Sequence, residues 1–170
     1  MTPTATASGT PFTVSSRSAG VGSSVARISR YWPRITTCDF ATDSAVIQPA
    51  EETKLEASLA KIAEVVKRGE KFMKMTLYVA GHTDTVGTNA KNRKLSLDRA
   101  RAIAKYFRKK KLTMPIAFAG FGEEVLKVKT ADSTDEAGNR RADYVIGPAS
   151  GAPPFKGPYL KVKAGWQLLR

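Results

Sequence analysis

Cysteine and histidine are nearly absent from the chain, since Cys38 and His82 are the only residues of their kinds among 170. A single cysteine excludes an internal disulfide framework. Structural zinc sites use four cysteine and histidine ligands, so one residue of each makes a metal site built by the protein a poor expectation. The sequence therefore argues against disulfide and metal chemistry.

Long hydrophobic runs are also missing. No window of about 18 apolar residues occurs, so we expect no helix that spans a membrane. The first 20 residues, MTPTATASGTPFTVSSRSAG, lack a basic start followed by an apolar block, and we expect no secretory signal in them. Cys38 is not preceded by the small residues of a lipid-attachment site. Export of the protein is thus left unexplained by these features.

Acidic residues do not occur near either end of the sequence. All 15 lie between Asp39 and Asp143, while four arginines precede them and four basic residues follow, which together carry +8 of the net charge of +13. Residues 1–24 are mostly Ser, Thr, Ala, Gly and Pro, and residues 147–158 (GPASGAPPFKGP) have the composition of a linker. We therefore predict a basic, flexible N-terminal tail over 1–35, one folded domain over 36–147, and a Pro/Gly linker with a basic tail over 148–170.

The middle of the chain has the patterns of a folded α+β domain. Hydrophobic residues make up 42% of the sequence and charged residues 25%, which is typical of a globular protein. Helical spacing of apolar residues predicts one helix from Pro49 to Gly69 and a second with Ser96 as its N-cap. Strands are predicted over 35–40, 75–80, 116–119 and 144–146. This β-α-β-α-β-β order predicts a sandwich of two main helices packed on one face of a small mixed sheet.

Two charged residues near the second helix are candidates for a binding site. Arg99 stands three residues after the expected cap, where an acidic residue would suit the helix dipole better. It either pairs with a carboxylate such as Asp98, or stays solvated, or offers a fork-shaped donor to a ligand carboxylate, helped by free amides at the helix start. Asp84, in the loop before the helix, either caps a turn or receives a ligand ammonium group.

Several motifs occur together in a defined order. They are GHTDTVG at 81–87, then Asn92, Leu95 and Ser96, then Arg99 and Ala100, then GFGE at 120–123, and NRRAD at 139–143. With these motifs, residues 36–147 resemble the OmpA-like peptidoglycan-binding domain. The resemblance implies a non-catalytic cell-wall anchor in the periplasm or cell envelope, associated with the outer membrane. Peptidoglycan is the implied partner, and an outer-membrane or envelope protein is a second one.

The resemblance also implies roles for individual residues. Asp84 and Arg99 match the family residues that grip the diaminopimelate of the stem peptide, the aspartate taking its ammonium and the arginine its carboxylate. Asn92 would hold the loop or add an amide contact, and Arg141 or Arg140 would lie near the same pocket, which Thr83 would help to complete. Family members often have Phe-Asp near the start of the domain, but here Phe40 is followed by Ala41. Either Asp43 takes the place of that aspartate, or the contact is absent and some affinity is lost.

Catalysis and cofactor binding have little support in the sequence. His82 matches a family histidine that does no ligand chemistry, so we expect a structural side chain, and no G-x-S-x-G or paired-carboxylate signature accompanies it. Gly120 and Gly122 form G-x-G without the third glycine of a nucleotide site. We therefore expect no enzyme activity and no cofactor.

Non-specific binding of nucleic acid is the alternative function. The sequence has a pI near 10.0, and its basic tails carry aromatic residues that stack on bases in other proteins. These residues are Tyr31, Trp32, Phe155, Tyr159 and Trp166. The same tails are also suited to another anionic polymer, or to docking on the domain or on a partner.

Overall fold

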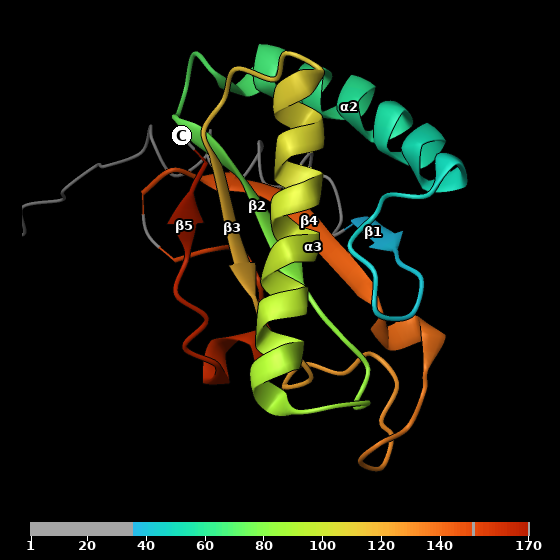
Figure 1. The fold of residues 1–170 in the computed structure, drawn as a ribbon. Coiled ribbons are helices and arrows are strands. Elements are labelled where there is room, and N and C mark those ends of the chain that lie inside the picture. The colour runs from blue at the N-terminus through green and yellow to red at the C-terminus, as the bar shows by residue number, and fades with distance from the viewer. Residues whose placement is uncertain (1–35, 151, 170) are drawn as a thin grey trace, which may run out of the picture.

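The computed structural model describes residues 36–150 and 152–169, and it contains one mixed sheet with two long helices. The elements are β1 (Thr36–Asp39), α2 (Pro49–Gly69), β2 (Met75–Gly81), α3 (Asn89–Lys109), β3 (Ile116–Gly120), the short 3-10 turn η1 (Ala137–Asn139), β4 (Arg141–Pro148), the short 3-10 turn η2 (Gly157–Lys161) and β5 (Gln167–Leu168). The strand order is β1-β4-β2-β3-β5. Only β2 and β3 run parallel, and α2 and α3 cover one face of the sheet (Figure 1), so the predicted α+β fold is confirmed.

The first helix has the bounds that its sequence predicts. Pro49 begins α2, two glutamates lie in its first turn, and Lys67 and Arg68 precede Gly69 at its end. This charge order complements the helix dipole, and the fixed φ of proline suits a first helical position. Its buried side chains include Leu55 and Ile62, and each such burial contributes about 1.5–3 kcal/mol.

The second helix begins earlier than predicted. α3 begins at Asn89, after Thr88, whose side chain accepts a hydrogen bond from the Lys91 backbone amide at 3.3 Å. The prediction of Ser96 as the N-cap is therefore wrong: its hydroxyl donates to the Arg93 carbonyl and accepts from the Gly122 amide, both at 2.8 Å. Arg99 consequently lies in the middle of α3, and free amides at a helix start do not assist it.

The helix is seated directly on the ends of two strands. A side-chain carbon added to Gly81 would lie 1.8 Å from the Ser96 carbonyl oxygen, and one added to Gly120 would lie 2.6 Å from the Leu97 nitrogen. Only glycine permits so close an approach of strand and helix backbones. The loop that follows β2 is thereby held at a set distance from the middle of α3.

The C-terminal residues cover the other face of the sheet. We predicted a linker and a basic tail from residue 148 onward, but in the described part β5 pairs with β3, and Phe155, Tyr159 and Trp166 pack over Tyr78, Phe121 and neighbouring sheet residues. Phe155 is only 4% exposed. The segment is therefore an integral layer of the domain. Tyr31 and Trp32 of the predicted N-terminal tail lie outside the described residues.

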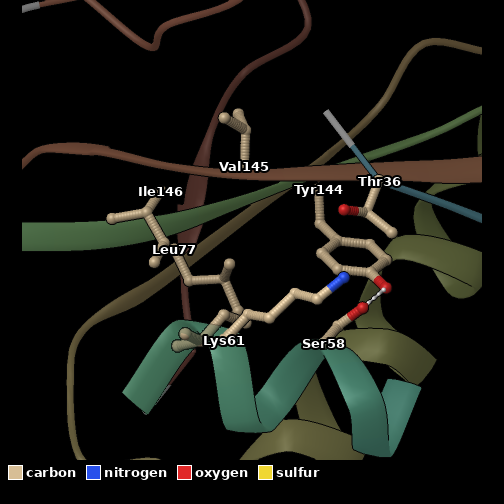
Figure 2. Close-up of a pocket in the computed structure, with 8 residues that line it drawn as sticks. Thr36, Ser58, Lys61, Leu77, Tyr144, Val145 and Ile146 are labelled. Atoms are coloured by element: carbon tan, nitrogen blue, oxygen red, sulfur yellow. Dashed lines mark hydrogen bonds between the residues drawn. The ribbon is translucent and has the colours of Figure 1, made fainter. Parts of the chain in front are cut away.

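A small hollow lies between α2 and the strands β1, β2 and β4. Its volume is about 60 Å³, and Figure 2 shows the Tyr144 hydroxyl bonded across it to Ser58 of α2, at 2.8 Å. Ligand pockets are commonly several hundred Å³, so this space is a packing gap bridged by a sheet-to-helix hydrogen bond.

Burial raises the pKa of the Cys38 thiol in β1 to about 12, which keeps it protonated and unreactive at neutral pH.

Within residues 36–150 and 152–169, no helix has the length and apolarity to cross a membrane.

Candidate functional site

The loop over residues 82–88 joins β2 to α3 and carries the candidate site. The backbone amide of His82 donates to the Arg141 carbonyl at 2.8 Å, and that of Thr83 donates to the Gly122 carbonyl at 2.9 Å. The Thr85 hydroxyl donates to the Ala131 carbonyl at 2.7 Å. The loop is thus tied to the start of β4, to the residues after β3 and to the 131–134 segment, which makes its backbone a rigid support.

Arg99 is completely buried, at 0% exposure, and among the described residues its guanidinium bonds only to backbone carbonyls. Nε donates to Ser44 at 2.8 Å, Nη1 to His82 at 2.8 Å and Nη2 to Ala41 at 3.0 Å. A guanidinium has five N–H donors, so two remain. Within the described residues, no carboxylate lies at ion-pair distance from Arg99.

The electrostatic surroundings of Arg99 are unusual for an arginine. Burial lowers the pKa of its guanidinium to about 10, while the negative charges of Asp84 and Asp43 act in the opposite direction. The group is still a cation at neutral pH, and it lies over the Phe40 ring, 5.4 Å from the ring centre. A buried cation without a paired carboxylate is costly, since carbonyl dipoles compensate only part of its lost hydration.

Asp84 is also buried, and it is engaged with Arg140. Its Oδ2 accepts from Arg140 Nη1 at 3.0 Å, and its Oδ1 accepts from the Val86 amide at 3.4 Å. Arg140 also pairs with Asp135. Asp84 therefore caps a turn, as the sequence allowed, and at the same time places a negative charge close enough to Arg99 to influence its pKa.

The structure places the two neighbouring arginines on opposite sides of the sheet end. Arg140 contacts Asp84, whereas the Arg141 guanidinium donates from Nε to Asp143 at 3.0 Å and from Nη2 to the Val125 carbonyl at 3.3 Å. Of the two residues that were predicted near the site, Arg140 is the one that reaches Asp84. Arg141 belongs to the cluster beneath the C-terminal segment.

The remaining predicted residues differ in their placement. Asn92 is buried and donates to the Asp84 carbonyl at 3.4 Å and to Glu123 at 2.5 Å, so it holds the loop. Thr83 is buried with no hydrogen-bond partner for its hydroxyl among the described residues. Asp43 is exposed, has a positive φ of 52° and pairs with Lys91 at 2.9 Å. Asp43 thus does not contact Arg99, and the Ala41 and Ser44 carbonyls contact it instead.

His82 connects the loop to the C-terminal segment. Its ring is fully buried and lies against Phe121 and Tyr159, with centroid distances of 5.5 and 5.4 Å. The Tyr159 hydroxyl donates to Asp143 at 2.5 Å and lies 3.2 Å from His82 Nε2. Because the His82 carbonyl accepts from Arg99, the same residue links the outer aromatic layer to the candidate site.

Folding stability should fall in mild acid because of His82. Burial lowers the pKa of His82 well below its ordinary value of 6.5, and the charges of Arg141 and Arg99 lower it further; Asp143, 3.5 Å away, is already bonded to Arg141. The unfolded chain therefore takes up a proton below about pH 6.5 that the folded chain does not, and the free energy of unfolding should drop by up to about 1.4 kcal/mol per pH unit. Urea unfolding midpoints across this range measure the effect.

The matched variant for this measurement is His82→Gln. His82 is the only histidine, so the variant should lose the slope between about pH 6.5 and 5, above the range in which carboxylates titrate. A wild-type free energy of unfolding that stays constant over that interval would contradict the burial of a neutral His82.

The chemistry available at the site is recognition of charge. Among residues 36–150 and 152–169, no group of three or more His, Cys, Asp or Glu side chains has the geometry to hold a metal ion. The loop and α3 bring together a buried cation with two remaining donors and a buried carboxylate, and the loop also carries the buried Thr83 hydroxyl, which has no partner among the described residues. Such a set suits a small ligand that carries both charges.

Sequence reasoning missed the carbonyl partners of Arg99 and the contribution of the C-terminal aromatic residues. Backbone carbonyls leave no residue-specific signal, so Ala41 and Ser44 were not predictable as partners. Tyr159 was assigned to a tail because GPASGAPPFKGP has the composition of a linker. The aromatic residues Phe155, Tyr159 and Trp166 of this segment indicated packing on the domain. From the sequence, however, this packing could not be distinguished from base stacking.

The chain is similar in sequence to one protein family and in structure to several solved domains. A family model described as the OmpA family matches residues 39–142. The peptidoglycan-associated lipoprotein of Burkholderia pseudomallei is 25% identical over 65% of this chain and 89% of its own, with a TM-score of 0.52. The OmpA-like domain of FopA1 from Francisella tularensis is 23% identical over 70% and 75%, with a TM-score of 0.51. The C-terminal domain of Helicobacter pylori MotB is 18% identical over 69% and 89%, with a TM-score of 0.55. The last two similarities concern the fold alone. No curated protein gave a match.

Proposed function

The chain belongs to the OmpA family of peptidoglycan-binding domains, and we propose that it is a non-catalytic cell-wall anchor that binds diaminopimelate in peptidoglycan stem peptides. In this proposal Asp84 receives the ligand ammonium group and Arg99 the ligand carboxylate. The similarity to a protein named peptidoglycan-associated lipoprotein supports the choice of polymer and a location in the cell envelope.

The buried, carbonyl-bound guanidinium of Arg99 is the observation that carries the proposal. A structural arginine inside a domain ordinarily has a carboxylate partner, because burying an unpaired charge is expensive. Arg99 has three carbonyl partners and two further donors, and its lowered pKa reports the cost of its burial. A ligand carboxylate would supply the missing negative charge.

Asp84 supplies the complementary half of the site. Diaminopimelate carries an ammonium and a carboxylate on one carbon, so its recognition needs an acceptor and a donor close together. The Asp84 carboxylate has only one charged partner in the described residues, Arg140, and it acts electrostatically on Arg99. Asn92 and Arg140 then serve to position Asp84.

The segment over residues 41–44 covers Arg99 and defines how a ligand would reach it. The Ala41 and Ser44 carbonyls occupy Nη2 and Nε, and a ligand carboxylate would bind beside them or replace them. The family aspartate after Phe40 is replaced by Ala41, and Asp43 pairs with Lys91 instead. Affinity for the ligand carboxylate would therefore depend on Arg99 without a second acidic residue to orient it.

The alternative, nucleic-acid binding by basic aromatic tails, loses part of its basis in this structure. Phe155 is buried, and Tyr159 and Trp166 pack against the sheet, so these three rings are occupied within the domain. Base stacking requires accessible ring faces. Peptidoglycan binding is therefore the better supported function.

Co-sedimentation with purified diaminopimelate-type sacculi tests the proposal. Asp84→Asn keeps the shape of the side chain and removes its charge, so binding should weaken about 30-fold, as expected for loss of a buried charge-assisted contact. Free meso-diaminopimelate should compete with the sacculi for the native protein. Sacculi with lysine in place of diaminopimelate lack the second carboxylate and should bind poorly.

Asp98→Asn is the matched control, since Asp98 lies on α3 and pairs with Arg101 at 3.1 Å, away from the loop. It should leave sacculus binding unchanged. Equal binding by the native protein and Asp84→Asn, or equal binding to both types of sacculi, would rule out the diaminopimelate site.

A further inference from the structure

The end of the domain opposite the 82–88 loop is strongly basic. α2 and α3 both end there, and Figure 1 shows their C-terminal ends together, at the other end of α3 from the loop. In residues 67–74 and 109–115 the only acidic residue is Glu70. We name this surface the basic pole, and its exposed cations are Lys67, Arg68, Lys71, Lys74, Lys109, Lys110 and Lys111.

The helix dipole accounts for only part of this charge. Cations in the last turn of a helix are favourable, which explains Lys67, Arg68 and Lys109. Lys71 and Lys74 lie beyond α2, in the connection to β2, where the dipole offers no comparable gain. Lys111 follows Lys110, the C-cap of α3, and has a positive φ of 65°, at a position where glycine is ordinarily preferred.

Three lysines of the pole have no ion-pair partner among the described residues. Lys110 pairs with Glu56 at 2.5 Å. In the part of the chain that the structure describes, no ion pair involves Lys71, Lys74 or Lys111. A concentration of unpaired like charges disfavours the compact state through self-repulsion, and an anionic partner relieves it.

Apolar surface is exposed within the same pole. Phe72 is 63% exposed and lies between Lys71 and Lys74 in the sequence. Next to it, a hollow of about 300 Å³ is lined by Val66, Met73, Met114 and Lys74, among others. A second hollow of about 260 Å³ shares Val66, Glu70 and Met114 with the first and is also lined by Lys67 and Lys111. Lysines and the single acidic residue Glu70 therefore border an apolar surface.

From this combination we propose that the basic pole docks on an anionic lipid bilayer, with the lysines at the headgroups and Phe72 at the boundary with the acyl chains. Lysines near an anionic membrane gain electrostatic energy, and an aromatic side chain between them gains apolar burial. A single exposed phenylalanine does not form the row of stacking faces that single-stranded nucleic acid uses. The pole also faces away from Asp84, so a membrane and the candidate wall site do not compete for the same surface.

Flotation of the full chain with phosphatidylcholine vesicles, with and without phosphatidylglycerol, tests this docking. The Lys71→Gln, Lys74→Gln double variant should bind phosphatidylglycerol vesicles about 25-fold more weakly, from a roughly fivefold contribution per lysine. Phe72→Ser should weaken binding about tenfold while leaving its salt dependence intact. Both changes are at exposed positions, and a urea midpoint measured on each variant checks that the fold is kept.

Matched controls remove the same groups elsewhere. Lys127→Gln with Lys129→Gln removes two exposed lysines far from the pole, and Leu160→Ser removes a side chain that is 70% exposed. Both controls should bind vesicles like the native protein. Equal losses in the controls and the pole variants, or binding to neutral vesicles as strong as to anionic ones, would overturn the proposal. The proposal would also be overturned if the pole variants lost more binding to a single-stranded oligonucleotide than to anionic vesicles.

Discussion

Replacing Arg99 with alanine is expected to lower the free energy of unfolding by about 2–4 kcal/mol, because three buried carbonyls lose their donor and a cavity replaces the side chain. These carbonyls belong to Ala41, Ser44 and His82, so the substitution also releases the segment before α2 from the loop after β2. Urea unfolding of the native and variant proteins at neutral pH measures the loss.

Arg99→Lys separates this structural role from binding. Lysine keeps the positive charge and three donors, but it lacks the planar fork that holds a carboxylate through two parallel bonds. The variant should therefore remain folded at low temperature and yet lose sacculus binding by at least about 30-fold. A folded Arg99→Lys protein that binds sacculi like the native chain would show that Arg99 serves the fold and not the ligand.

Arg101→Ala provides the control for both measurements. Arg101 lies two residues further along α3, is partly exposed, and pairs with Asp98 at 3.1 Å. Ion pairs of this kind contribute about 0–1 kcal/mol, so the control should unfold near the native midpoint and bind sacculi normally.

Phe155→Ala should destabilise the domain by about 3–5 kcal/mol, the usual loss for a buried phenylalanine. Phe155 stacks on Tyr159 and Trp166, with ring centroids 4.6 and 5.7 Å apart, and fills the layer over the outer face of the sheet. For a chain of this length the melting temperature should fall by roughly 6–20 °C. Differential scanning calorimetry measures this shift.

Leu160→Ala tests the same segment at an exposed position and should change stability by less than about 0.5 kcal/mol. If Phe155→Ala melted together with this control, the C-terminal residues would be a dispensable attachment to the sheet. A large loss confined to Phe155 would establish the segment as a layer of the core.

The two helices differ in how well local sequence patterns predict where each helix begins. The bounds of α2 are written into its sequence by Pro49, the acidic first turn and Gly69. The first two turns of α3, from Asn89, are polar and show no apolar stripe, so Ser96 was wrongly taken as the cap. Their buried residue is Asn92, which contacts the Asp84 carbonyl and Glu123, and such a polar contact has no periodic signature.

The placement of the two arginines in NRRAD depends on where the last strand begins. We predicted the last strand from residue 144, but β4 begins at Arg141. Alternate residues of a strand share a face, so Arg141 and Asp143 lie together beneath the C-terminal segment, and Arg140 turns toward Asp84. If the strand had been predicted to begin three residues earlier, the sequence alone would have placed Arg141 and Asp143 on the same face.

The sequence by itself determined the fold class, the candidate pair Asp84 and Arg99, and the resemblance to OmpA-like domains, because these depend on periodicity and on motifs at fixed spacing. Tertiary structure decided the rest. It placed Arg99 among the carbonyls of Ala41, Ser44 and His82, assigned Arg140 to Asp84, and folded the C-terminal aromatics onto the sheet. These contacts join backbone atoms and apolar faces that are far apart in the sequence. Local residue patterns therefore do not predict them.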